Sequence, residues 1–237
     1  MKIEAWAKTD TGLKRESNQD SFIIDHELGL YVVADGMGGH KGGEVASAMA
    51  VEILKNVVGE NQNSDPKELL TRAYRLATYG IYQKGQKEFG LRGMATTMVA
   101  LLVKNETFYI ANVGDSRAYL FSPPGFWLLT EDHSYFNEQL KAGLVKEEDR
   151  NGFEGRNIIT RSVGFEPDVR ADVIEHKAVP GETILLCSDG LYGLVPDQSL
   201  ASLCLAADPA TALDKLIDEA KKRGGDDNIT LILVRVS

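Results

Sequence analysis

The stretch VVADGMGGHKGGE, residues 32–44, joins an apolar run to a glycine-rich turn through one acidic residue, Asp35. The run from residue 30 to residue 34 predicts a buried strand, and apolar residues at helical spacing from 43 to 58 predict a helix after the turn. Glycine loses much conformational freedom on folding, so five glycines within eight positions indicate backbone that bends sharply or approaches another group closely. We expect Gly38, Gly39, Gly42 and Gly43 to turn the chain into the helix.

Other strands and helices are predicted on both sides of this stretch. Strand-like runs, rich in β-branched and aromatic residues, occupy residues 21–24, 97–103, 107–113, 117–121, 183–187 and 229–236. Further helices are predicted from Asp65 to about Lys87 and from Asp208 to about Arg223, each opening on an Asp-Pro pair. Because the two long helices are consecutive and the strands run without helices between them, antiparallel sheets with helices packed outside are favoured over a doubly wound parallel sheet.

Length and composition indicate one domain over residues 1–237. The chain is 43% hydrophobic and 26% charged, with no linker, repeat or low-complexity tract. Its net charge of −9 argues against nucleic acid or an anionic membrane as the main partner, because both bind basic surfaces. The two cysteines, Cys187 and Cys204, form no disulfide framework, and no stretch resembles a signal peptide or a membrane span. We therefore expect a cytoplasmic protein.

Acidic residues stand at the ends of the predicted strands. Asp35, Asp115 and Asp189 follow apolar runs, Asp227 lies two residues before the last run, and Asp20 directly precedes residues 21–24. Any one of them could simply form a turn. As a group at one rim of the sheets they would repel each other, by about 4 kcal/mol per pair at 4 Å and an effective dielectric constant near 20. All-oxygen ligands without histidine or cysteine favour hard cations, so we predict a Mg²⁺ or Mn²⁺ site.

Gly36 fits this metal hypothesis. A glycine directly after Asp35 would let its backbone carbonyl reach the same metal ion. The pattern does not match the dinucleotide-binding sequence G-x-G-x-x-G, because Lys41 stands where the last glycine belongs.

Six motifs in order resemble the phosphatase 2C family of metal-dependent serine/threonine protein phosphatases, in its bacterial form. They are R-x-x-N-Q-D at 15–20, V-A-D-G-M-G-G-H at 33–40, V-G-D-S-R at 113–117, E-D-H-S at 131–134, C-S-D-G-L at 187–191 and G-x-D-N-I-T at 225–230. Each motif is weak alone, whereas the ordered set is specific and spans nearly the whole chain. The resemblance implies an α+β fold: a four-layer α-β-β-α sandwich of two antiparallel sheets flanked by helices.

The resemblance also assigns metal ligands. It implies that Asp35 bridges two metal ions and that the Gly36 carbonyl contacts one of them. Asp189 and Asp227 then bind the other ion, and Asp20 holds a metal-bound water. Asp115, sharing Asp189, is implied as the ligand of a weaker third ion.

Further residues are implied to bind substrate or shape the site. Arg15 resembles the guanidinium that binds the substrate phosphate. Asp132 and His133 are expected to anchor the segment that follows them, and Asn228 to shape the loop beside Asp227. His40 has two open interpretations, a general acid for the leaving serine or a structural residue at the helix start.

The implied reaction is hydrolysis of phosphoserine or phosphothreonine by direct attack of a water that bridges two metal ions. Such water is partly hydroxide near neutral pH, and no phosphoenzyme forms. Asp35, Asp189 and, as an open question, His40 are the implied catalytic residues. A cysteine nucleophile is not indicated, because the sequence C-x5-R is absent at Cys187 and Cys204.

Substrate choice is left open by the sequence. Residues 134 to about 157 match the family's flap beside the active site, but N-G-F-E-G-R-N replaces its common wording. The implied partners are phosphorylated proteins, with a serine/threonine kinase and its substrates as candidates, and a monomer is expected. Two rival hypotheses are a non-catalytic phosphoprotein-binding module, disfavoured because every ligand acid is retained, and a phosphatase of small molecules.

Overall fold

The computed structural model describes residues 1–122, 125–205 and 208–237, except the side chains of residues 40, 41 and 151. The strands are β1 (Ile3–Asp10), β2 (Asp20–Asp25), β3 (Leu30–Met37), β4 (Ala95–Thr96), β5 (Met98–Lys104), β6 (Thr107–Val113), β7 (Arg117–Ser122), β8 (Gly125–Leu128), β9 (Asp172–Lys177), β10 (Thr183–Cys187) and β11 (Ile229–Val236). The helices are α1 (Gly39–Glu60), α2 (Pro66–Lys87), α3 (Tyr135–Lys141), α4 (Asp189–Tyr192), α5 (Asp197–Cys204) and α6 (Pro209–Lys222), with short 3-10 helices η1 (Phe89–Leu91) and η2 (Glu147–Gly152).

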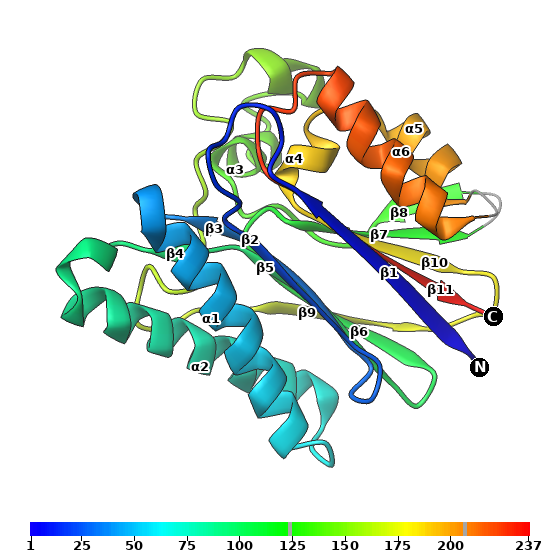
Figure 1. Ribbon diagram of the computed structural model, residues 1–237, viewed down its shortest axis with the longest axis horizontal. Helices are drawn as coiled ribbons and strands as arrows, with labels where there is room; N and C mark the ends of the chain where they lie inside the picture. The colour runs from blue at the N-terminus through cyan, green and yellow to red at the C-terminus, as the bar shows by residue number, and fades with distance from the viewer. Residues whose placement is uncertain (123–124, 206–207) are drawn as a thin grey trace.

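The strands form two antiparallel sheets that pack face to face. One sheet has the order β1-β11-β10-β7-β8, and the other has the order β2-β3-β5-β6-β9, with β4 paired to β3. Helices α1 and α2 cover the second sheet, and α5 and α6 cover the first (Figure 1). This is the predicted four-layer α-β-β-α sandwich, and the prediction is confirmed.

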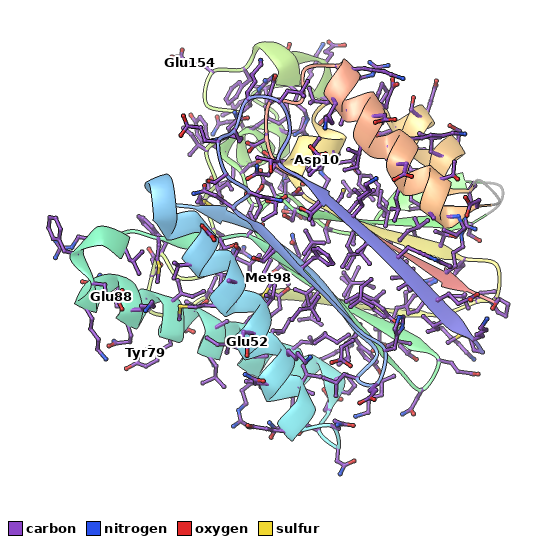
Figure 2. All side chains as sticks on the ribbon, in the orientation of Figure 1. Asp10, Glu52, Tyr79, Glu88, Met98 and Glu154 are labelled. Carbon is purple, nitrogen blue, oxygen red and sulfur yellow. The ribbon has the colours of Figure 1, made fainter. Side chains whose placement is uncertain are left out.

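Alternating side chains explain why the central strands read as continuous apolar runs. In β10, Ile184 and Leu186 pack against the other sheet, whereas Leu185 and Cys187 pack beneath the helices. Both faces of the strand are buried, so every position except Thr183 is apolar. Figure 2 shows side chains filling the spaces between the layers, with Met98 of β5 on the side of α1 and α2.

The predicted helix starts at Asp-Pro are confirmed. Asp65 accepts hydrogen bonds from the backbone of Lys67 and Glu68 at the start of α2, and Asp208 accepts one from Thr211 at the start of α6. Helix α1 begins earlier than predicted, at Gly39 instead of residue 43. The turn is already complete at Gly38 and Gly39, which both have positive φ (131° and 74°).

Strands β1, β8 and β9 and helices α3, α4 and α5 were not predicted. Strands β1, β8 and β9 lie at sheet edges, and many of their residues are half-buried or exposed, so their composition is mixed. The short helices α3 to α5 offer too few turns for a clear periodicity. In the described part of the chain, no helix has the length and apolar character that crossing a membrane requires.

Candidate functional site

The predicted acids gather where strands of both sheets end. Asp20 begins β2 and lies opposite Asp35 of β3 in the strand pairing. Asp115 lies in the turn between β6 and β7, Asp189 is the first residue of α4 after β10, and Asp227 precedes β11. Each of the four most buried members, Asp20, Asp35, Asp115 and Asp189, is influenced electrostatically by others of the group. The sheets therefore bring together side chains that are far apart in the sequence.

A cavity of about 660 Å³ lies in front of these carboxyls. Asp35, Asp115, Asp189 and Asp227 line it, together with Arg15 and Gly36. Asp20 lies behind this lining, where the Ser188 hydroxyl donates to its Oδ2 at 2.8 Å. We call this cavity the acidic pocket.

Burial and mutual repulsion raise the pKa of these carboxyls. Burial has the largest effect on Asp35, and the charges of Asp20 and Asp189 add to it, so its pKa lies well above the ordinary range. Burial first of all raises the pKa of Asp20 to about 7 and that of Asp189 to about 6. The pKa of Asp115 is also raised well above its usual value, by burial and then by Asp189. A cation among these groups would relieve the repulsion.

Two carboxylate oxygens in the pocket region support a cation site. Asp20 Oδ1 and Asp189 Oδ1 are buried without a hydrogen-bond partner in the described residues. Buried oxygen donors of this kind fit a hard divalent ion. Within the described ranges, however, no three His, Cys, Asp or Glu side chains stand ready to hold a metal ion. The donor chemistry fits, and ion binding requires some movement of the side chains.

Arg15 forms an ion pair with Asp227, which the sequence did not predict. Its Nη2 donates to Asp227 Oδ2 at 2.6 Å, and this hydrogen bond raises the pKa of Arg15. The Arg15 side chain is 52% exposed and lines the acidic pocket. Arg15, the candidate for phosphate binding, therefore contacts Asp227, a candidate metal ligand. A cation bound at Asp227 would compete with the guanidinium for this carboxylate.

Asn228 fixes the loop beside Asp227, as the sequence predicted. Its Oδ1 accepts from the backbone N–H of Gln19 at 2.8 Å, and its Nδ2 donates to the carbonyls of Thr11 and Ser17 at 2.9 and 3.0 Å. Its own backbone N–H donates to Asp227 Oδ1 at 2.8 Å. One amide side chain thus joins the N-terminal loop that carries Arg15 to the C-terminal loop.

Gly36 is required by a close backbone approach. A Cβ at Gly36 would lie 2.1 Å from the carbonyl oxygen of Gly43, and a Cβ at Gly43 would lie 2.6 Å from that of Gly36. Gly42 likewise lies against Met94, where a Cβ would stand 3.1 Å from the Met94 Cβ. The expectation that Gly42 and Gly43 form the turn is wrong: both lie inside α1 and allow it to pack against β3 and its neighbours.

A buried ion pair, missed in the sequence, stands behind the acidic pocket. Arg117 donates to both carboxylate oxygens of Asp132 at 2.8 and 2.6 Å, and the exposed fractions of the two side chains are 11% and 4%. The guanidinium also lies 3.7 Å from the ring centroid of Tyr192 in α4. Burial alone would lower the pKa of Arg117, but Asp132 raises it above its ordinary value. An arginine at the head of the apolar run 117–121 is the signal that could have indicated this pair.

His133 holds the turn that carries Asp115. The backbone N–H of Gly114 donates to His133 Nδ1 at 3.0 Å. The backbone N–H of His133 donates to the Gly114 carbonyl, also at 3.0 Å. Because Nδ1 accepts this hydrogen bond and so carries no proton, Nε2 is the protonated nitrogen and donates to Asp172 Oδ2 at 2.8 Å. Asp132 and His133, predicted to anchor the segment that follows them, are thus held by hydrogen bonds to Arg117 and to Gly114 and Asp172.

The segment expected to be a flap leaves the sandwich and returns to it. It contains α3 and η2, and a bridge between Ser134 and Ile159 joins its two ends. Phe153 packs against the rings of Tyr135 and Phe136, and the exposed Glu154 lies at its outer side (Figure 2). His40 lies in the first turn of α1, but its side chain is outside the described residues.

Comparison with known proteins agrees with this geometry. A sequence model of the family Protein phosphatase 2C matches residues 13–228. The chain is 35% identical over 240 residues to the serine/threonine phosphatase stp of Listeria innocua, covering 98% of this chain and 95% of that protein. Among solved structures, the S. agalactiae serine/threonine phosphatase aligns with a TM-score of 0.93 at 34% identity, covering 100% of both chains. The catalytic domain of the phosphatase PstP in complex with 2 manganese ions aligns at 0.90 with 29% identity, over 99% of each chain.

Sandwich fold and acid-lined pocket together define a metal-dependent phosphatase. The chain belongs to the protein phosphatase 2C family and is a protein phosphatase, as its motifs predicted.

Proposed function

We propose that this protein hydrolyses phosphoserine and phosphothreonine in other proteins, with the acidic pocket as its active site. One observation carries the proposal: four aspartates that end or precede strands line a single cavity together with Arg15, and Glu16 and Lys14 also border it. The substrate phosphate carries two negative charges, so a pocket of bare carboxylates would repel it. Bound cations are needed to make the charge of the pocket positive. Metal dependence follows from the family and from this charge pattern.

The proposed metal ligands are the acids already located. Asp35, with the Gly36 carbonyl, and Asp189 and Asp227 would hold two ions, either Mn²⁺ or Mg²⁺. Asp115 would hold a weaker third ion together with Asp189. When bound, the ions supply an acidified water and neutralise phosphate charge. The buried, unpaired Asp189 Oδ1 supports this assignment.

The protein's own residues bind and orient the substrate. Arg15 would donate to two phosphate oxygens, because its planar guanidinium matches them. Its partner Asp227 would exchange this contact for a cation when substrate binds. Asp20 would accept a hydrogen bond from the water nearest the ions, since its Oδ1 has no other partner among the described residues. His40, in the first turn of α1, keeps its two interpretations: proton donor to the leaving serine, or structural residue at the helix start.

A phosphatase assay tests the function directly. Purified protein is given phosphoserine, phosphothreonine and phosphotyrosine peptides with Mn²⁺, with Mg²⁺ or with chelator. We expect turnover of the first two peptides, only with metal, and no turnover by Asp35→Ala. Binding of phosphopeptide without turnover would instead identify a non-catalytic binding module.

Thermal unfolding provides an independent measurement of the ion site. Millimolar Mn²⁺ should raise Tm, because ions that bind only the folded state stabilise it. Equal Tm values with chelator and with Mn²⁺ would contradict a cation site at the acid cluster.

The proposed setting is the cytoplasm, with a serine/threonine kinase and its substrates as partners and a monomeric enzyme. Cys187 and Cys204 are both free and buried, which supports a reducing compartment. Burial raises the pKa of Cys187 and brings that of Cys204 to about 12, so neither is an activated nucleophile.

A further inference from the structure

A second cavity opens beside the acidic pocket. It has a volume of about 360 Å³ and shares four lining residues with that pocket: Met37, Gly38, Asn157 and Ile159. We call it the side groove. Its other walls come from Ala95 of β4 and from the segment 160–169 that follows the flap. The two cavities are therefore continuous along one surface.

The walls of the side groove are held in place by main-chain contacts. Thr96 and Val163 exchange two backbone hydrogen bonds, of 2.9 and 2.8 Å, which tie β4 to the segment 160–169. Gly164 has a φ of 97°, and a Cβ there would lie 2.2 Å from the Ile81 side chain, so the turn is seated tightly on α2. A groove with fixed walls binds a ligand without a large ordering cost.

Two of the charged side chains at the outer wall, Arg161 and Asp168, already have partners. Arg75 donates to both oxygens of Asp168 at 2.9 and 3.0 Å. Arg161 donates to Asp172 at 3.1 Å and to the Arg170 carbonyl at 3.2 Å. The wall also carries the exposed Glu166 and an apolar part made of Met37, Ile159, Phe165 and Val169, and this apolar part can contact an apolar side chain.

Phe165 is the most unusual member of this wall. Its side chain is 63% exposed although it stands on a turn fixed by Gly164. An aromatic ring exposed to water at the mouth of a groove gains free energy when an apolar group covers it.

The connection to the acidic pocket identifies the occupant. Consecutive Cα atoms lie 3.8 Å apart, so residues two or three positions from a phosphoserine lie about 7–11 Å from it. A polypeptide whose phosphate reaches Arg15 is long enough to carry its neighbouring residues past Met37 and Ile159, which border both cavities. A small phosphate ester is too short to do so.

We propose that the side groove binds an apolar side chain of the phosphoprotein substrate, two or three residues from the phosphoserine. This rests on the proposed function and adds a sequence preference to it: the enzyme selects phosphosites with a nearby Leu, Ile, Met or Phe.

Paired phosphopeptides test the preference. Each pair has one sequence and differs only in Leu or Ser at a single position between −3 and +3, and p-nitrophenyl phosphate serves as the small substrate. We expect kcat/KM about tenfold higher for the Leu member at one position, the scale of discrimination by an apolar pocket. Phe165→Ser should abolish most of this difference by raising KM for the Leu peptide, and should leave turnover of p-nitrophenyl phosphate unchanged.

Phe89→Ser is the matched control. Phe89 is 88% exposed in η1 and does not line the side groove, so the Leu preference should survive its loss. Equal kcat/KM for all peptide pairs in the wild-type enzyme, or a preference that persists in Phe165→Ser, would overturn the inference while the phosphatase function stands. Absence of turnover for every phosphorylated substrate would overturn the function, and the inference with it.

Discussion

Replacing Asp132 by alanine should destabilise the protein strongly. The carboxylate accepts two hydrogen bonds from Arg117, and both side chains are nearly inaccessible to water. Without Asp132, a buried guanidinium is left with the hydroxyl of Tyr119 and the ring of Tyr192 as its polar contacts in the described residues. Neither neutralises its charge.

The expected size of the effect follows from that burial. Removing one partner of a buried ion pair costs about 3–5 kcal/mol, against about 0–1 kcal/mol for an exposed pair. For a domain of this size each kcal/mol lowers Tm by about 2–4 °C, so Asp132→Ala should lower Tm by about 6–20 °C. Adding Arg117→Met should recover part of the loss, because it removes the unpaired charge.

Urea unfolding, followed by the fluorescence of the two tryptophans, measures the free energy of unfolding. Asp168→Ala is the matched control, since it breaks an equally bidentate pair with Arg75 whose side chains are 60% and 61% exposed. A loss for Asp132→Ala no larger than that for Asp168→Ala would refute the reasoning. So would an Arg117→Met/Asp132→Ala protein less stable than Asp132→Ala alone.

Three further predictions concern the acids and Arg15. In chelator, the free energy of unfolding should fall as pH rises from about 5 to 8. Asp20 has a pKa of about 7 in the folded protein and an ordinary value of 3.8, so in this range the folded state binds a proton that the unfolded state has lost. A free energy of unfolding that rises with pH in urea titrations would contradict this. Asp35→Ala should abolish turnover, whereas Asp115→Ala should still bind Mn²⁺ in calorimetry but turn over more slowly. Full activity of Asp115→Ala at limiting Mn²⁺ would refute the assignment of a third ion to Asp115. Arg15→Ala should raise KM for an aryl phosphate more than it lowers kcat, with partial rescue by Arg15→Lys, and an unchanged KM in steady-state assays would exclude phosphate binding by Arg15.

Much of the fold and the acid cluster could be predicted because the signals are local. The central strands are buried on both faces, so β10 and β11 appear as largely apolar runs, interrupted only by Thr183, Thr230 and Arg235, and an acid at the end of such a run stands out. The order of helices and strands then favoured antiparallel sheets. The edge strands β1, β8 and β9 carried no comparable signal: β9 reads DVIEHK and is exposed or half-buried throughout.

Contacts between distant segments could not be predicted from the sequence. The pairing of Arg15 with Asp227 joins residues 212 positions apart, and the approach of Gly36 to Gly43 depends on how α1 crosses β3. The same limit applies to the side groove, whose walls come from β3, β4 and the segment 160–169. Spacing in a sequence indicates which side chains share a face, but not which loops meet.

Neighbouring hydroxyl and amide groups explain how the acid cluster keeps its place despite its own repulsion. The hydroxyl of Thr97 accepts from the Asp35 backbone N–H at 3.0 Å, and that of Thr96 donates to the Asp35 carbonyl at 2.8 Å. Ser188 donates to the Asp20 carboxylate, and Asn228 binds the backbone of the N-terminal loop. These groups hold the main chain around the acids and one carboxylate oxygen of Asp20, so the acids stay close together although their side chains must still move to bind an ion. The sheets and their hydroxyl anchors therefore supply the stability that the active-site acids remove.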